Sequence, residues 1–214
     1  MATNLVLFGG LDATFDLGLW VTDGTSAGTW EIAAGVVDSN GNHDPNPVAL
    51  TSIGSEVLFN SWGELYVTDG TSPGTREISV TGANTDIGLS PSSFFKFGSE
   101  VLFQGRDSTG GPFSLGLEGL WVTDGTSAGT SELSVAGANT AGVGLEPSDF
   151  TPLGSEALFV GLDATRLGLW VTNGTSAGTS EISLPGGSQG DLFGTGFAPT
   201  FARTFFGCTM PVTE

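Results

Sequence analysis

The sequence predicts an all-β protein built from four copies of one unit, and two observations carry this prediction. A ten-residue phrase that starts with an aromatic residue, Val and Thr recurs along the chain, and such a phrase indicates a repeat architecture. Apolar and polar residues alternate around each copy with a period of two, and no stretch shows the helical period. The four copies are Trp20 to Thr29, Tyr66 to Thr75, Trp121 to Thr130 and Trp170 to Thr179.

Each copy is typical of a β-hairpin. Its first three residues alternate as in a half-buried strand, and Asp-Gly supplies a turn because Gly accepts a positive φ angle. In the last copy Asn173 replaces Asp, which keeps the turn chemistry and removes the charge. The predicted second strands of the hairpins are Trp30 to Ile32, Arg76 to Val80, Ser131 to Val135 and Ser180 to Leu184.

Two further strands are predicted before each hairpin. A buried strand follows a constant Gly-Ser-Glu turn, in Ile53 to Phe59, Phe97 to Phe103 and Leu153 to Phe159, and Asn4 to Phe8 is the first counterpart. A shorter strand precedes that turn, and a Pro stands before it, as expected where a strand begins. These shorter strands are Val48 to Leu50, Ser93 to Phe95 and Asp149 to Thr151, preceded by Pro47, Pro91 and Pro147. Each unit therefore has four strands, A to D.

Four strands every 40–50 residues or so is the period of a β-propeller blade. We therefore predict one propeller domain over residues 1–214, with blades at 1–34 plus 197–203, 47–81, 91–136 and 147–185. The first blade starts at strand B, and Phe197 to Ala202 has the Pro and aromatic residues of a strand A. Pairing this segment with Asn4 to Phe8 would close the ring. The alternatives are an open arc that dimerises and a fragment of a larger ring, because Thr204 to Glu214 could begin a further strand B.

The charge balance narrows the classes of partner. The chain has 5 Lys and Arg against 23 Asp and Glu, a formal net charge of −18. Nucleic acids and anionic membrane surfaces require clustered cations, so neither is predicted as a partner. No apolar run reaches the ~18 residues of a membrane-spanning helix, and the N-terminus lacks the pattern of a signal peptide. The single Cys208 cannot form an internal disulfide.

Leu19 to Thr29 and Leu120 to Thr130 resemble the bacterial ELWxxDGT repeat, which occurs in long secreted or cell-surface proteins. Glu64-Leu65-Tyr66 matches the start of that motif, whereas Gly often stands in place of Glu-Leu in the other copies. The resemblance covers the four repeats, and the C-terminal tail departs from the pattern. It implies a propeller-like module at an extracellular or cell-surface location, and it implies no particular ligand.

Most residues that could carry chemistry have a structural explanation. His43 is the only histidine and has no nucleophile near it in the sequence, so catalysis is not predicted there. Asp23, Asp69 and Asp124 stand at hairpin tips, where turn geometry explains them and calcium binding is the alternative. The aromatic residues that open each phrase, Trp20, Tyr66, Trp121 and Trp170, are expected to pack between blades.

One face of the predicted ring varies more than the other. The A–B and C–D turns are nearly constant, whereas the B–C loops (9–18, 60–63, 104–119 and 160–168) and the D–A loops (33–47 and 185–198) differ. Variable loops on a constant scaffold are where recognition usually lies. An Asp follows the strand-B Phe by four residues in three of these loops. The candidate ligand-binding residues are Asp12, Trp62, Arg106, Asp107, Asp163 and Arg166.

These observations favour a non-catalytic binding or surface module, lectin-like or adhesive, that is a monomer or a small homo-oligomer. A glycan or another surface protein is the expected partner, and calcium is the only cofactor that the loops suggest. A purely structural repeat domain is the first alternative. The second is a glycoside-acting enzyme, which would need two carboxylates about 5–9 Å apart.

Overall fold

The computed structural model describes residues 5–13, 15–32, 46–109 and 115–183, and these residues form four antiparallel sheets. Their only helical element is a single 3-10 turn, Ser176–Gly178, so none of them forms a helix that could cross a membrane. The strands are β1 (Val6–Leu11), β2 (Leu17–Thr22), β3 (Thr29–Glu31), β4 (Val48–Ile53), β5 (Glu56–Ser61), β6 (Glu64–Thr68), β7 (Arg76–Glu77), β8 (Ser92–Phe97), β9 (Glu100–Arg106), β10 (Glu118–Thr123), β11 (Ser131–Glu132), β12 (Ser148–Leu153), β13 (Glu156–Leu162), β14 (Leu167–Thr172) and β15 (Ser180–Glu181).

Each sheet is a meander in which neighbours in sequence pair side by side. The second, third and fourth sheets have four strands each, β4 to β7, β8 to β11 and β12 to β15, in the predicted order A to D. The first sheet has three described strands, β1 to β3, because the segment predicted to supply its strand A, residues 197–203, lies outside the described residues. The all-β fold and the four repeated sheets are therefore confirmed.

The strands differ from the prediction in two details. Strand A carries a β-bulge, where Ala49, Ser93 and Asp149 have φ angles of 57°, 53° and 53°. A bulge inserts one unpaired residue and bends the strand, and alternation alone does not predict it. Strand D ends earlier than predicted: β7, β11 and β15 have two residues each.

The Asp-Gly-Thr turn is held by its own side chains, and the second sheet shows how. Oδ1 of Asp69 accepts hydrogen bonds from the N–H (2.9 Å) and the hydroxyl (2.7 Å) of Thr71. The hydroxyls of Thr68 and Thr75 bond each other at 2.6 Å, and Gly70 has a φ angle of 89°. A Cβ on Gly74 would lie 2.0 Å from Oδ1 of Asp69, so only Gly fits there. Turn geometry thus explains each polar residue of the phrase.

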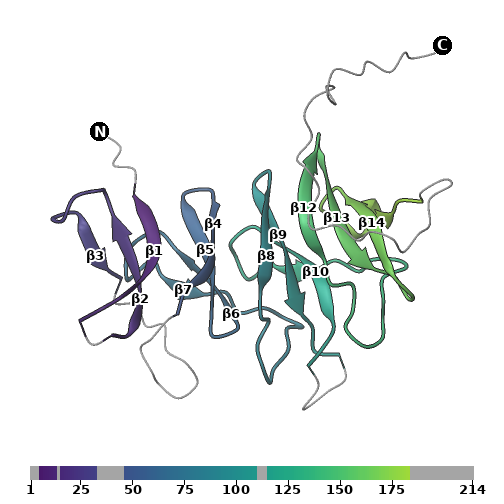
Figure 1. Ribbon diagram of the computed structural model, residues 1–214, viewed down its shortest axis with the longest axis horizontal. Coiled ribbons are helices and arrows are strands. Elements are labelled where there is room, and N and C mark those ends of the chain that lie inside the picture. Colours follow the sequence, from purple (N-terminus) through teal and green to yellow (C-terminus); the bar gives the residue numbers. More distant parts are fainter. Residues whose placement is uncertain (1–4, 14, 33–45, 110–114, 184–214) are drawn as a thin grey trace, which may run out of the picture.

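The four sheets follow one another in a row, with the first and the fourth at opposite ends (Figure 1). The A strands are neighbours along this row, since β4 lies next to β8 and β8 next to β12. This arrangement is propeller-like. Closure of the ring stays a prediction, because the segment that would close it lies outside the described residues.

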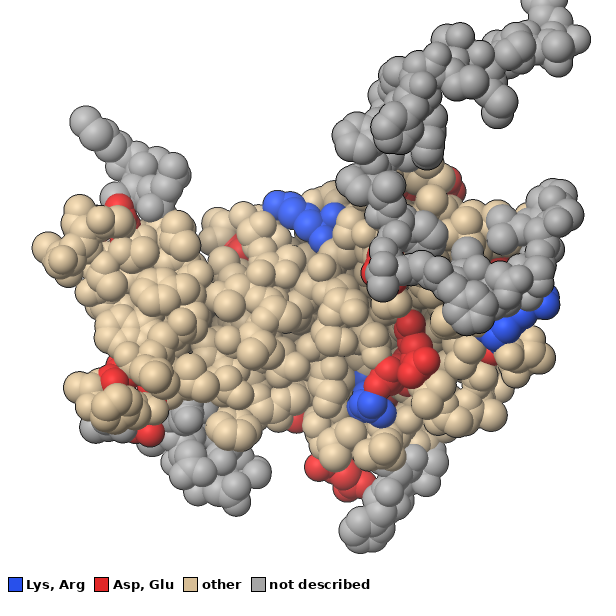
Figure 2. All heavy atoms as spheres, in the orientation of Figure 1, with Lys and Arg blue, Asp and Glu red and all other residues tan. Residues whose placement is uncertain are grey.

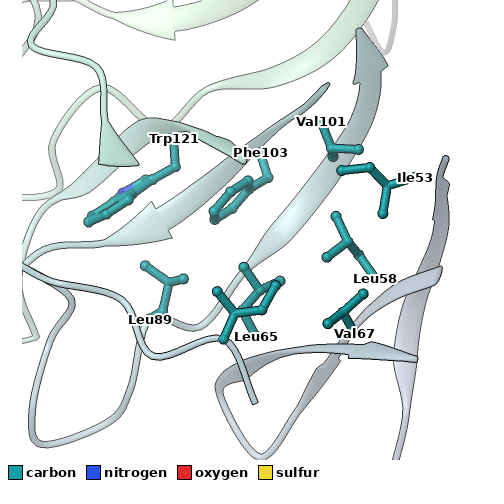
Figure 3. Packing of buried hydrophobic residues seen from close by; sticks show 9 residues of the cluster. Ile53, Leu58, Leu65, Val67, Leu89, Val101, Phe103 and Trp121 are labelled. Atoms are coloured by element: carbon teal, nitrogen blue, oxygen red, sulfur yellow. The ribbon is translucent and has the colours of Figure 1, made fainter. Parts of the chain in front are cut away.

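Each sheet presents two different apolar faces. The aromatic face carries the strand-B Phe and the Trp or Tyr of strand C, which are cross-strand partners, and it packs on the preceding sheet. The aliphatic face carries Leu, Val and Ile from strands B, C and D, and it packs on the following sheet. Figure 3 shows one such junction, in which Trp121 and Phe103 of the third sheet meet Leu58, Leu65 and Val67 of the second.

The aromatic residues are the wedges that the sequence predicts. Trp121 is 1% exposed, Trp170 is fully buried and Tyr66 is buried, each between two sheets. The indole N–H of Trp121 donates to the carbonyl of Gly105 at 3.0 Å, which satisfies its one polar group. Trp20, in the first sheet, has no preceding sheet in the described structure and is half-buried.

Candidate functional site

The antiparallel order sets which segments share an edge of each sheet. The A–B and C–D turns lie at one end of the strands, and the B–C and D–A loops lie at the other end. We call the end with the B–C and D–A loops the variable edge of the sheet. The described parts of the B–C loops therefore lie at the same edge of each sheet, whereas nearly all of the predicted D–A loops 33–47 and 185–198 lies outside the described residues. His43 and Cys208 lie outside the described residues.

The three recurring loop aspartates build their own loops. Oδ1 of Asp107 accepts hydrogen bonds from the N–H groups of Thr109 (3.0 Å) and Leu117 (2.7 Å). Oδ1 of Asp163 accepts from Thr165 (2.6 Å) and Arg166 (2.7 Å), and these bonds lower the pKa of Asp163, that from Thr165 most. Asp12 accepts from the N–H of Asp16 at 3.0 Å. These carboxylates order the loops, and their role toward a ligand stays a prediction.

The other predicted site residues lie in the same loops. Arg106 pairs with Glu118, which also accepts a hydrogen bond from Gln104. Nε of Arg166 lies 3.8 Å from Oδ2 of Asp163. Trp62 is half exposed in the tight B–C turn of the second sheet. The two arginines are thus engaged by carboxylates of their own sheets.

The two D–A loops that the structure describes, which follow the second and third sheets, resemble each other. Residues 82–85 and 137–140 both read Gly-Ala-Asn-Thr. The Asn84 amide donates to the carbonyl of Asp107 at 3.2 Å, and the Asn139 amide donates to the carbonyl of Asp163 at 3.1 Å. Each loop therefore fastens one sheet to the B–C loop of the next, a role that this repeated tetrapeptide could have revealed.

A cavity of about 360 Å³ opens at the variable edge of the third sheet. It lies between the start of β10, strand β11 and the following D–A loop, and Asp107 is part of its wall. Its apolar walls come from Leu120, Leu133, Val135 and Leu145, and its polar groups from Asp107, Thr109, Glu118, Glu132, Ser134, Asn139 and Thr140. On the face shown in Figure 2, acidic side chains and a basic one gather over this third sheet, whereas the face of the first two sheets is largely neutral.

Glu118 and Glu132 are carboxylates of this cavity that the sequence did not suggest, and Glu132 is the one that forms no ion pair among the described residues. Its carboxylate lies over Gly119, where a Cβ would stand 2.0 Å from Oε1, although the residue as a whole reaches solvent. Burial of the carboxylate and the nearby charge of Asp107 raise the pKa of Glu132 to about 7. The side chain makes no hydrogen bond with the described part of the chain, so it is free to bind a ligand.

The sequence does not distinguish Glu132 from its equivalents, because strand D has a Glu in every repeat. Glu31, Glu77 and Glu181 occupy the same position in the other sheets, each opposite the wedge aromatic residue. Glu132 lies beside a cavity whose shape depends on how the D–A loop at 138–145 folds back. No sequence pattern predicts how this loop folds.

The second sheet holds a different carboxylate pair at the same edge. Glu64 stands where the other sheets have Gly18, Gly119 and Gly168. Burial and the charge of Glu77 raise the pKa of Glu64 to about 7, and burial raises the pKa of Tyr66 to about 12.

Calcium binding at the loop aspartates would need several carboxylates close together. Among the described residues, no three or more His, Cys, Asp or Glu side chains gather in a way that could hold a metal ion. Asp12, Asp107 and Asp163 are thus not brought together as one cluster, since each belongs to a different sheet of the row.

Comparison with known proteins adds no family. No model of a known protein family matches the chain, and no curated protein matches it significantly. The resemblance to the ELWxxDGT repeat therefore rests on the repeated phrase itself.

Proposed function

We propose that this protein is a non-catalytic binding module, lectin-like or adhesive, and that it holds a small polar ligand such as a sugar in the cavity of the third sheet. The observation that carries the proposal is the cavity itself. It has the size of a small-molecule site and combines apolar walls with a few polar groups. It also opens at the edge where the loops vary.

The chemistry of the lining suits a carbohydrate. The C–H faces of a sugar ring can pack on Leu117, Val135 and Ala138, the half-buried apolar residues of the lining, while its hydroxyls need acceptors and donors. The free carboxylate of Glu132 is an acceptor, and the hydroxyls of Ser134 and Thr140 can serve as both. A net charge of −18 argues against an anionic ligand.

The extracellular location, the ELWxxDGT membership and the assignment of each sheet as a propeller blade are parts of the same proposal. The repeated phrase supports the membership, and the row of four similar sheets supports the assignment of each sheet as a blade. Secreted and cell-surface proteins commonly display binding loops on a constant scaffold, which agrees with a module of this kind.

A glycan array followed by calorimetry on the bound glycans tests the function. We expect Glu132→Gln to weaken binding about tenfold, as loss of one charge-assisted hydrogen bond of about 1.4 kcal/mol implies. Glu181→Gln, at the same position of the fourth sheet, is the matched control and should bind like the wild type. If no glycan binds the wild type, the lectin-like function is wrong and the structural-repeat alternative gains.

A glycoside-acting enzyme is the second candidate, and the raised pKa of Glu132 is the observation that favours it. A carboxylic acid that is half protonated near pH 7 can act as a general acid. The nearest partner, Asp107, is already held by two N–H donors, which makes it a poor base. Hydrolysis of chromogenic aryl glycosides by the wild type, abolished in Glu132→Gln, would support this candidate over a lectin.

A further inference from the structure

The two ends of the row expose complementary halves of the interface that joins the sheets. At the first sheet the aromatic face is uncovered: Phe8 is 38% and Val6 is 60% exposed, whereas their counterparts in the third sheet, Phe103 and Val101, are fully buried. At the fourth sheet the aliphatic face is uncovered: Leu153 is 42% exposed, whereas its counterpart in the second sheet, Ile53, is 5% exposed.

The three internal junctions show what each uncovered face fits. In every one, an aromatic face packs on an aliphatic face, and the three clusters use the same positions. The aliphatic set is Leu58, Leu65, Val67 and Ile78 in the second sheet and Leu102, Leu120, Val122 and Leu133 in the third; in the fourth sheet it is Leu158, Leu169, Val171 and Ile182, all half-buried.

One contact at the turns makes the match specific. A Cβ on Gly125 would lie 3.7 Å from the Ile53 side chain of the preceding sheet. A Cβ on Gly174 would likewise lie 3.1 Å from the ring of Phe97. In the first sheet, Gly24 is equivalent to Gly125, and a Cβ added to it would meet no heavy atom within 4 Å. In the fourth sheet, Leu153 is equivalent to Ile53 and is exposed. Each end therefore lacks the partner residue that the other end carries.

From this continuity we infer that the uncovered faces bind each other between two copies of this chain, head to tail. The aromatic face of the first sheet, with Val6, Phe8 and Trp20, receives the aliphatic face of a partner's fourth sheet. Among the described residues of one molecule the two faces stand at opposite ends of the row (Figure 1), so a second copy can bring them together. Such a heterologous contact gives a closed ring if the rotation between copies closes and a longer array if it does not.

Analytical ultracentrifugation of the full chain over a range of concentrations tests this inference. We expect the wild type to associate into dimers or larger species as concentration rises. Val6→Asp and Leu153→Asp place a charge in one face each, at positions that are exposed in the single molecule, so both variants should fold and each should stay monomeric. Leu115→Asp changes an exposed apolar residue that lies on neither face and should associate like the wild type.

Mixing the two monomeric variants distinguishes a head-to-tail contact from other modes. Val6→Asp keeps an intact aliphatic face and Leu153→Asp keeps an intact aromatic face, so an equimolar mixture should form one-to-one dimers and nothing larger. A wild type that is monomeric at every concentration would overturn the inference. A ring that closes within one chain would give that result, because it leaves neither face uncovered. Association that survives both substitutions, or a mixture that stays monomeric, would overturn it as well.

Discussion

At the residue scale, the repeated phrase is a hydrogen-bonded turn in which side chains replace the missing backbone partners. Asp, three Thr hydroxyls and two Gly positions recur because each makes or permits one contact of the turn. Asn173 shows which part of Asp matters: its Oδ1 accepts the same two bonds from Thr175, at 3.0 and 2.7 Å. Hydrogen-bond geometry, and not charge, therefore maintains this residue.

A substitution pair at Asp124 tests this explanation. Asp124→Ala should destabilise the protein by about 1–2 kcal/mol, because two donors of Thr126 lose their acceptor. Asp124→Asn, which copies the natural residue of the fourth turn, should cost less than about 0.5 kcal/mol near neutral pH. Chemical denaturation measures both, and equal losses would mean that the charge matters.

The raised pKa of Glu132 makes a prediction about pH. Its carboxyl titrates near 7 in the folded state and near 4.5 when unfolded, so the unfolded chain loses the proton first. Stability is therefore lost as pH rises from about 4.5 to 7, and Glu132→Gln should remove that loss. Because solvent screens the group, we expect only about 1 kcal/mol at pH 8, or about 2–4 °C in Tm, and no gain at pH 4.

For Asp124 the pH dependence of stability has the opposite sign. Hydrogen bonds from Thr126 lower the pKa of its carboxyl below 3.8, so its contribution is present above that pH and lost as pH falls through the folded pKa. Melting curves of the two variants at pH 3, 4 and 8 separate the effects. A Glu132→Gln variant that gains stability at pH 4 but not at pH 8 would contradict the burial of this carboxylate.

At the element scale, the unit of stability is the junction between two sheets. Each sheet alone has two apolar faces and would leave both in water, so stacking is what buries them. The wedge aromatic residue lies at the centre of this junction, and its indole N–H is satisfied within its own sheet.

Removing one wedge should have a large effect. Trp121→Ala should cost about 3–5 kcal/mol, because it leaves a cavity between the second and third sheets. Trp30→Ala is the matched control: Trp30 is exposed, and its loss should cost less than about 0.5 kcal/mol. Equal melting temperatures for the wild type and Trp121→Ala would show that the junction packs differently.

Sequence patterns predicted the elements better than their ends. The Asp-Gly turns, the strand-B apolar triplets and the wedge positions follow from local chemistry, and all of them appear in the structure. The bulges at Ala49, Ser93 and Asp149 and the early end of strand D depend on how the chain crosses to the next sheet. These are tertiary constraints that alternation does not encode.

At the scale of the whole molecule, the two ends of the strands have different structural roles. One edge carries constant turns that hold the sheets, and the other carries loops that join neighbouring sheets and frame a cavity. The sequence predicts a site in the variable loops with Asp107, which lines the cavity. It does not identify Glu132, because a residue present in every repeat stands out only when the fold places a cavity beside it.

Under the proposed function, a ligand binds at the variable edge of the third sheet and not at the Asp-Gly-Thr turns. Hydrogen–deuterium exchange with and without a glycan selected on an array locates the ligand directly, without any substitution. We expect the glycan to slow exchange in peptides that cover 107–120 and 132–145. Exchange in the turns at 23–29, 69–75 and 124–130 should not change. Protection confined to those turns would contradict it.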